Sequence, residues 1–139
     1  MTSQPWVIPV FGTALVTVAV FALIRAISAS VNRRLAAAHP WQKPAPGAVS
    51  RRFQSFHIGG MGLLWGFHVS VDEQHLHLFP TFFARTLGLR PTSVPWAVIR
   101  MKKRSRSGRW AEVTIGDLGV FGPAWCLGLA EPGVPRPRP

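Results

Sequence analysis

The sequence predicts a single N-terminal transmembrane α-helix plus a small, mostly β cytoplasmic domain. Two observations indicate these parts: a long uncharged apolar run at the start, and short alternating apolar segments separated by turn residues in the rest. A third is the distribution of charge, because all 16 Lys and Arg residues follow the apolar run. With 139 residues in total, the chain beyond the helix suffices for one compact domain.

The apolar run is long enough to cross a bilayer. Residues 2–24 carry no charge, and the stretch from Trp6 to Ile24 would span about 28 Å as a helix, close to the ~30 Å hydrocarbon core. A cleaved signal peptide is the alternative, but its positive charge would precede the apolar run, whereas here the charge follows. The residues expected to anchor the helix are Trp6, Phe11, Phe21 and Arg25.

Basic residues flank only the C-terminal end of this helix. The first six are Arg25, Arg33, Arg34, Lys43, Arg51 and Arg52, and no acidic residue precedes Asp72. The positive-inside rule therefore places the N-terminus outside and the domain in the cytoplasm.

The helix is expected to extend beyond the membrane. Ile27, Val31 and Leu35 form one apolar stripe in an Ala-rich segment that runs to Ala38, and Pro40 ends the helix. Within the membrane, a small-residue face for packing against another helix is formed by Gly12, Thr13 and Thr17. The predicted organisation is a helix over 1–38, a Pro-rich linker over 39–50, a β domain over 51–130 and a Pro-rich tail over 131–139.

The domain contains several short segments with β-type alternation. Expected strands are Phe53–Ile58, Trp65–Val71, His75–Phe79, Pro95–Met101, Arg109–Ile115 and Ala124–Leu129. In the second of these, Trp65, Phe67, Val69 and Val71 should share one face. Residues 59–62 are expected to form a bend, and 81–89 either a short helix or an excursion between strands. This spacing predicts a curled antiparallel sheet or partial barrel.

Two of these segments resemble a known family. Residues 68–78 (HVSVDEQHLHL) and 94–99 (VPWAVI) are similar to the corresponding parts of small bacterial PH-like (GRAM-like) domains. The resemblance covers about 55–115 and implies a module that binds lipid headgroups or proteins, with no catalytic residues to carry over. The chain departs from the family at His75, where glycine is usual. It also has no amphipathic stretch after Leu129 long enough for the helix that caps a complete PH barrel.

Residues able to support catalysis are sparse. The five acidic residues are scattered. Cys126 is expected to be a small buried hydrophobe near Trp125 and Leu127. It is not expected to be reactive, because no basic neighbour in the sequence would lower its pKa. His75 and His77 lie on one strand face and are expected to face solvent, although with His57 or His68 they could hold a metal ion. We therefore expect no enzyme activity, no metal and no cofactor.

The segment with the clearest functional content is the basic loop at residues 100–109. Six of its ten residues are basic: Arg100, Lys102, Lys103, Arg104, Arg106 and Arg109. One hypothesis is an accessory or structural subunit, located in a bacterial inner (cytoplasmic) membrane, that braces or assembles a membrane protein complex through its helix and its basic domain. The alternative is a tethered module that binds anionic lipid headgroups. Membrane lipids and other subunits are the expected partners, and nucleic acid is not, because no RNA-binding motif or recognition helix accompanies the charge.

Overall fold

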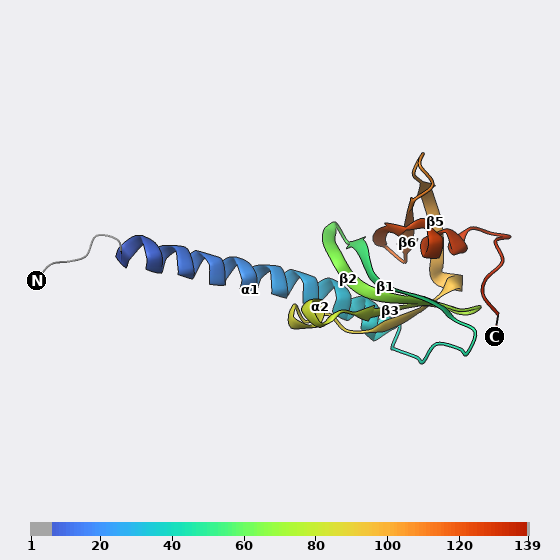
Figure 1. Cartoon of the computed structure of the whole chain (residues 1–139), viewed down its shortest axis with the longest axis horizontal. Helices are drawn as coiled ribbons and strands as arrows, with labels where there is room; N and C mark the ends of the chain where they lie inside the picture. The colour runs from blue at the N-terminus through green and yellow to red at the C-terminus, as the bar shows by residue number, and fades with distance from the viewer. Residues whose placement is uncertain (1–6, 139) are drawn as a thin grey trace, which may run out of the picture.

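A computed structural model describes residues 7–138, which form one long helix and a seven-stranded antiparallel sheet that curls into a half-barrel (Figure 1). The elements are α1 (Val7–Ala38), β1 (Val49–Ile58), β2 (Met61–Val71), β3 (His75–Pro80), α2 (Phe82–Thr86), β4 (Thr92–Pro95), η1 (Trp96–Val98), β5 (Ile99–Arg104), β6 (Trp110–Ile115), β7 (Leu118–Pro123), α3 (Ala124–Leu127) and η2 (Gly128–Ala130). The predicted fold class, a long apolar helix with a small, mostly β domain, is therefore confirmed.

The sheet consists of two meanders joined side by side. Its strand order is β4-β3-β2-β1-β7-β6-β5, so β1 through β4 and β5 through β7 each pair in sequence. The meanders meet where His57 and Ile58 of β1 pair with Phe121 and Val120 of β7. The tight turn between β1 and β2 uses Gly59 and Gly60, both with positive φ, which confirms the expected bend.

The core lies on the concave side of this sheet. Strand alternation directs Phe67, Val69 and Val71 of β2 inward, and all three are buried. Phe56 of β1 packs edge to face on Phe67, with ring centroids 5.7 Å apart. Leu35 of α1 belongs to the same core, so the last turns of the helix form part of the domain.

Most of α1 is uncovered by the rest of the described chain. Its apolar stretch is long enough to cross a membrane, and none of that stretch is buried, which distinguishes it from the core helix of a globular domain. Phe11, Phe21 and Arg25 are exposed, while Trp6 lies outside the described residues. The helix ends at Ala38, as Pro40 predicts.

Several expectations about the strands were wrong in detail. The last strand is Leu118–Pro123, and residues 124–130 form short helical turns because Pro123 starts a helix there. Residues 96–98 form a 3₁₀ turn rather than the start of β5. Trp65 leaves the inward face of β2, because its positive φ of 50° at an irregularity in the β1–β2 pairing turns the indole outward. For residues 81–89, the helical alternative holds, as α2.

The proline-rich segments lie against the domain. Backbone N–H of Gln42 donates to Ser93 Oγ at 2.8 Å, and the Trp41 ring packs on Phe79 with centroids 5.5 Å apart. In the tail, the Arg136 guanidinium lies 5.1 Å from the centre of the Trp96 ring. Both segments are therefore held by contacts along their length, although neither forms regular structure.

Candidate interaction surfaces

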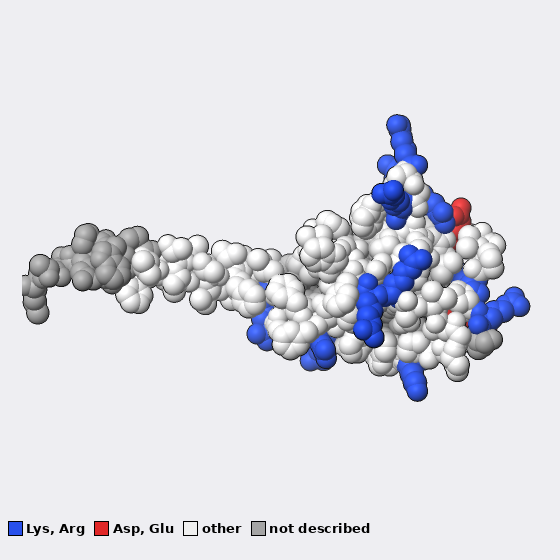
Figure 2. Space-filling model, viewed as in Figure 1, with Lys and Arg blue, Asp and Glu red and all other residues white. Residues whose placement is uncertain are grey.

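The basic loop forms the projecting hairpin β5–β6. Met101 and Val113 are paired across it, and a bulge places Lys102 and Lys103 against the single residue Glu112. The tip closes through Ser105 N–H donating to Trp110 O at 2.9 Å, with Gly108 at positive φ. Figure 1 shows the hairpin at a steep angle to α1, and Figure 2 shows Lys and Arg side chains gathered on it.

Two of the six basic residues are committed to contacts within the chain. Lys102 Nζ lies 2.8 Å from Glu112 Oε1. Arg104 Nη2 donates to Gly128 O at 3.2 Å and lies 3.2 Å from Glu131 Oε2, which ties the hairpin to η2 and the tail. Both pairs are largely exposed, so their contribution to stability is small.

The other four basic residues are available to a partner. Arg100, Lys103, Arg106 and Arg109 are exposed, and none forms an ion pair within the described residues 7–138. Next to the hairpin's tip the Trp110 ring stacks on Phe121 of β7, with centroids 5.6 Å apart and an interplanar angle of 13°. The hairpin therefore presents unpaired positive charge from an ordered stem.

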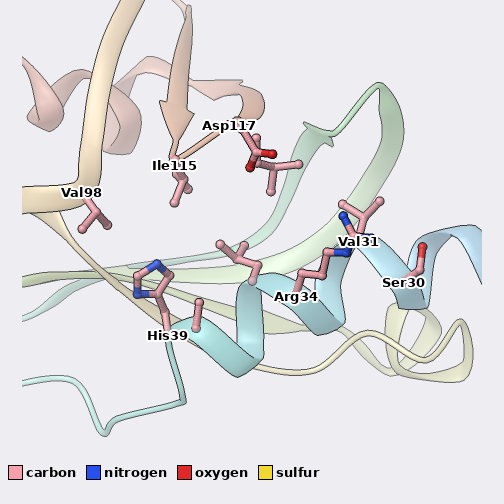
Figure 3. Close-up of a pocket in the computed structure, with 11 residues that line it drawn as sticks. Ser30, Val31, Arg34, His39, Val98, Ile115 and Asp117 are labelled. Carbon is pink, nitrogen blue, oxygen red and sulfur yellow. The ribbon is translucent and has the colours of Figure 1, made fainter.

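An apolar cleft lies beside the base of this hairpin. It has a volume of about 550 Å³, within the range of small-molecule and side-chain pockets, and lies between the end of α1 and the β6–β7 turn. Figure 3 shows Val98 and Ile115 facing the end of α1 across it, with Arg34 and Asp117 on opposite walls. The cleft is therefore lined by both apolar and polar side chains, including one charge of each sign.

A hydrogen-bonded network around Asp72 closes the β2–β3 turn and attaches the linker. One carboxylate oxygen accepts from the backbone N–H groups of Gln74 and His75, and the other lies 2.8 Å from His77 Nε2. Ala45 N–H donates to the same second oxygen at 3.1 Å. His77 Nδ1 lies 2.8 Å from Ser93 Oγ, and the ring is buried, so the expectation of a solvent-facing His77 was wrong.

The same network lowers the pKa of Asp72 and makes the surrounding cluster a poor metal site. Burial raises the pKa of Asp72, but hydrogen bonds from His77 and from three backbone N–H groups outweigh burial and lower it to about 2. Asp72, His75 and His77 lie close enough to share an ion. The Asp72 carboxylate and the His77 ring nevertheless already bond to protein groups, and an ion would have to break these contacts, which close the turn.

Cys126 offers no reactive thiol. Its side chain is fully buried in α3, as expected, and burial raises its pKa to about 12. The geometry at Cys126 therefore provides no activated thiol nucleophile.

The proposed helix-packing residues occupy two faces of α1. Thr13 and Thr17 line a shallow groove together with Val10, Ala14 and Val18, while Gly12 lies outside that groove. Thr17 Oγ1 donates to Thr13 O at 2.9 Å, so this hydroxyl is satisfied within the helix. Whether another helix packs here stays a prediction.

Sequence reasoning missed the cleft and the docking of α1. The cleft joins residues 30–39 to 115–118, and no local pattern relates such distant segments. The docking had a weak signal: Ser28 and Asn32 are polar, four residues apart and within an apolar helix, which is the spacing of one helix face.

No protein family, curated protein or solved structure in the comparisons matches this chain. The resemblance to PH-like domains therefore stays a prediction.

Proposed function

We propose that this chain is a non-catalytic, membrane-anchored accessory subunit whose β5–β6 hairpin binds an acidic surface of another subunit of a bacterial inner-membrane complex. The observation that carries this proposal is the set of four unpaired basic residues, Arg100, Lys103, Arg106 and Arg109, on a hairpin at a steep angle to α1. α1 spans the bilayer with its N-terminus outside, which leaves the domain in the cytoplasm.

The direction of the hairpin supports a protein partner over lipid headgroups. Figure 1 shows β5 and β6 on the part of the domain remote from the apolar half of α1. A helix that crosses the bilayer along its normal would point this hairpin along the membrane plane rather than toward it. The cations would then meet a neighbouring subunit before they meet headgroups of the same membrane.

The cleft adds an apolar component to the same surface. Val98 lines the cleft and Arg100 begins the row of unpaired cations, so the two features are contiguous in the chain. A partner segment with acidic residues beside one apolar side chain would complement both. Unpaired charges give specificity and a fast association rate, while burial of the apolar side chain slows dissociation.

The proposal is tested by purification in mild detergent followed by native mass spectrometry. The triple variant K103E/R106E/R109E should lose its co-purifying subunits. The matched variant R85E/R90E/R138E, which changes the net charge equally at exposed residues away from the hairpin and outside the six flanking basic residues, should keep them. A wild-type chain that purifies as a solitary monomer, or equal retention by both variants, would contradict the proposal.

A further inference from the structure

Four exposed apolar side chains cluster where α1 enters the domain. Leu64, Trp65, Phe82 and Phe83 have exposed fractions of 74%, 68%, 78% and 63%, and are called here the apolar patch. The two segments that carry them are adjacent, because Thr81 N–H donates to Gly66 O at 2.9 Å. The patch is therefore carried by two adjacent segments, the start of β2 and the start of α2.

The segments that carry the patch contact α1 just beyond its uncharged run. Ser28 Oγ lies 2.7 Å from Met61 Sδ at the start of β2, and a Cβ placed on Gly88 would lie 3.1 Å from Ala29 Cβ. Ser28 and Ala29 follow the last uncharged residue of the run, Ile24, by four and five positions, or roughly 6–8 Å along the helix. That depth corresponds to the headgroup region of a bilayer whose hydrocarbon core ends near Ile24.

The arrangement in the figures agrees with this level. In Figure 1, α2 and the β1–β2 hairpin form the end of the domain that faces the apolar half of α1. In Figure 2, the surface at that end is mostly uncharged, with a few Lys or Arg side chains at its margin. An apolar, aromatic surface bordered by cations is typical of proteins that rest in the membrane interface.

The backbone holds Trp65 outward at a cost. A bulky residue at a φ of 50° is unfavourable, yet the chain keeps it there, where backbone N–H of Trp65 donates to Ser55 Oγ at 2.9 Å. Without this irregularity, strand alternation would direct the indole to the same face as Phe67. Strained conformations of this kind persist mainly where the side chain has a role.

We propose that the apolar patch inserts into the headgroup–acyl boundary of the bilayer that α1 spans, as a second membrane contact that fixes the orientation of the domain. The proposal rests on the membrane-spanning role of α1 given above. Continuity with the apolar surface of α1, the level along that helix and the aromatic composition all favour lipid over a protein partner as the occupant.

Depth-dependent quenching of a fluorescent label tests the proposal in the full chain. An environment-sensitive dye is attached to W65C, F83C, V16C or S107C, each in nanodiscs containing nitroxide-labelled phosphatidylcholine and phosphatidylglycerol. The wild-type chain serves as the labelling blank, because Cys126 is buried. The label on V16C should be quenched most by nitroxides deep in the acyl chains, and the labels on W65C and F83C most by nitroxides near the headgroups. The label at S107C, on the hairpin tip, should not be quenched.

The outcomes separate the patch from the anchor. Quenching at V16C with no more quenching at W65C and F83C than at S107C would contradict the membrane contact of the patch. It would not contradict the membrane-spanning role of α1. No quenching at V16C would contradict the membrane-spanning helix and the patch together. Because the Phe83 side chain is exposed, F83C should keep the wild-type melting temperature, and its quenching remains decisive if W65C fails to fold.

Discussion

The two halves of α1 belong to one continuous helix but have different surroundings. From Val10 to Ile27 every side chain is exposed, and Thr17 satisfies its hydroxyl within the helix. From Ser28 onward the helix buries polar side chains: Asn32 donates to Arg90 O at 3.1 Å and accepts from Arg90 N–H at 2.5 Å. The first half therefore requires a lipid environment, whereas the second half is covered by the β domain.

This difference shows how the anchor and the domain are joined without a free hinge. The linker that follows α1 is held as well, because Thr92 Oγ1 donates to His39 O at 2.6 Å and Ala45 N–H donates to Asp72. Contacts on both sides of Pro40 therefore fix the domain relative to the helix axis. The angle between the basic hairpin and α1 follows from these contacts.

The largest expected effect on the free energy of unfolding comes from core packing, which only the second half of α1 takes part in. L35A should lower the free energy of unfolding of the domain by about 2–4 kcal/mol, because it leaves a cavity in the core. L23A, which removes the same atoms from an exposed position, should leave that free energy nearly unchanged. Urea titration of the two purified variants in mild detergent, followed by tryptophan fluorescence, measures both. Equal losses would show that the two halves are not distinct.

A second variant tests the polar contact at the junction. N32L should lower the free energy of unfolding by about 1–3 kcal/mol, because the backbone N–H and C=O of Arg90 lose their partner in a part-buried position. S30A removes only an exposed bond to Ile27 O within the helix and should cost much less. The same urea titration applies. An N32L variant as stable as S30A would mean that water replaces Asn32 at no cost.

The linker end of the junction should respond to acid. Because the pKa of Asp72 is lowered from 3.8 to about 2 in the folded chain, its stabilising effect is present above pH ~4 and is lost as the pH falls toward 2. The loss should reach about 2 kcal/mol. D72N should be less stable than wild type near neutral pH, with the difference shrinking as the pH falls. Thermal melts of both proteins between pH 2 and 7 measure this; a constant difference would contradict it.

The sequence was informative where the pattern is local. The long apolar helix, its end before Pro40 and the hairpin pairing of β5 with β6 all follow from neighbouring residues and are confirmed. Predictions from the sequence were wrong where contacts between distant segments determine the environment of a side chain. The burial of His77 depends on Asp72 and Ser93, and the outward turn of Trp65 depends on an irregularity in pairing with β1. Alternation alone assigns both side chains to the wrong environment.

The smallest expected effect contrasts the buried contacts of the junction with the exposed pair of the hairpin. K102Q should lower the free energy of unfolding by less than about 1 kcal/mol, because Lys102 and Glu112 remain in contact with solvent that screens their attraction. Added salt should weaken the wild-type hairpin by a similar amount, whereas the buried bonds of Asn32 should be nearly insensitive to it. Urea titrations of wild type, K102Q and N32L at low and high salt compare the two. A loss for K102Q as large as that for N32L would mean that the hairpin is held by its charges, and its cations would then be less available to a partner than proposed.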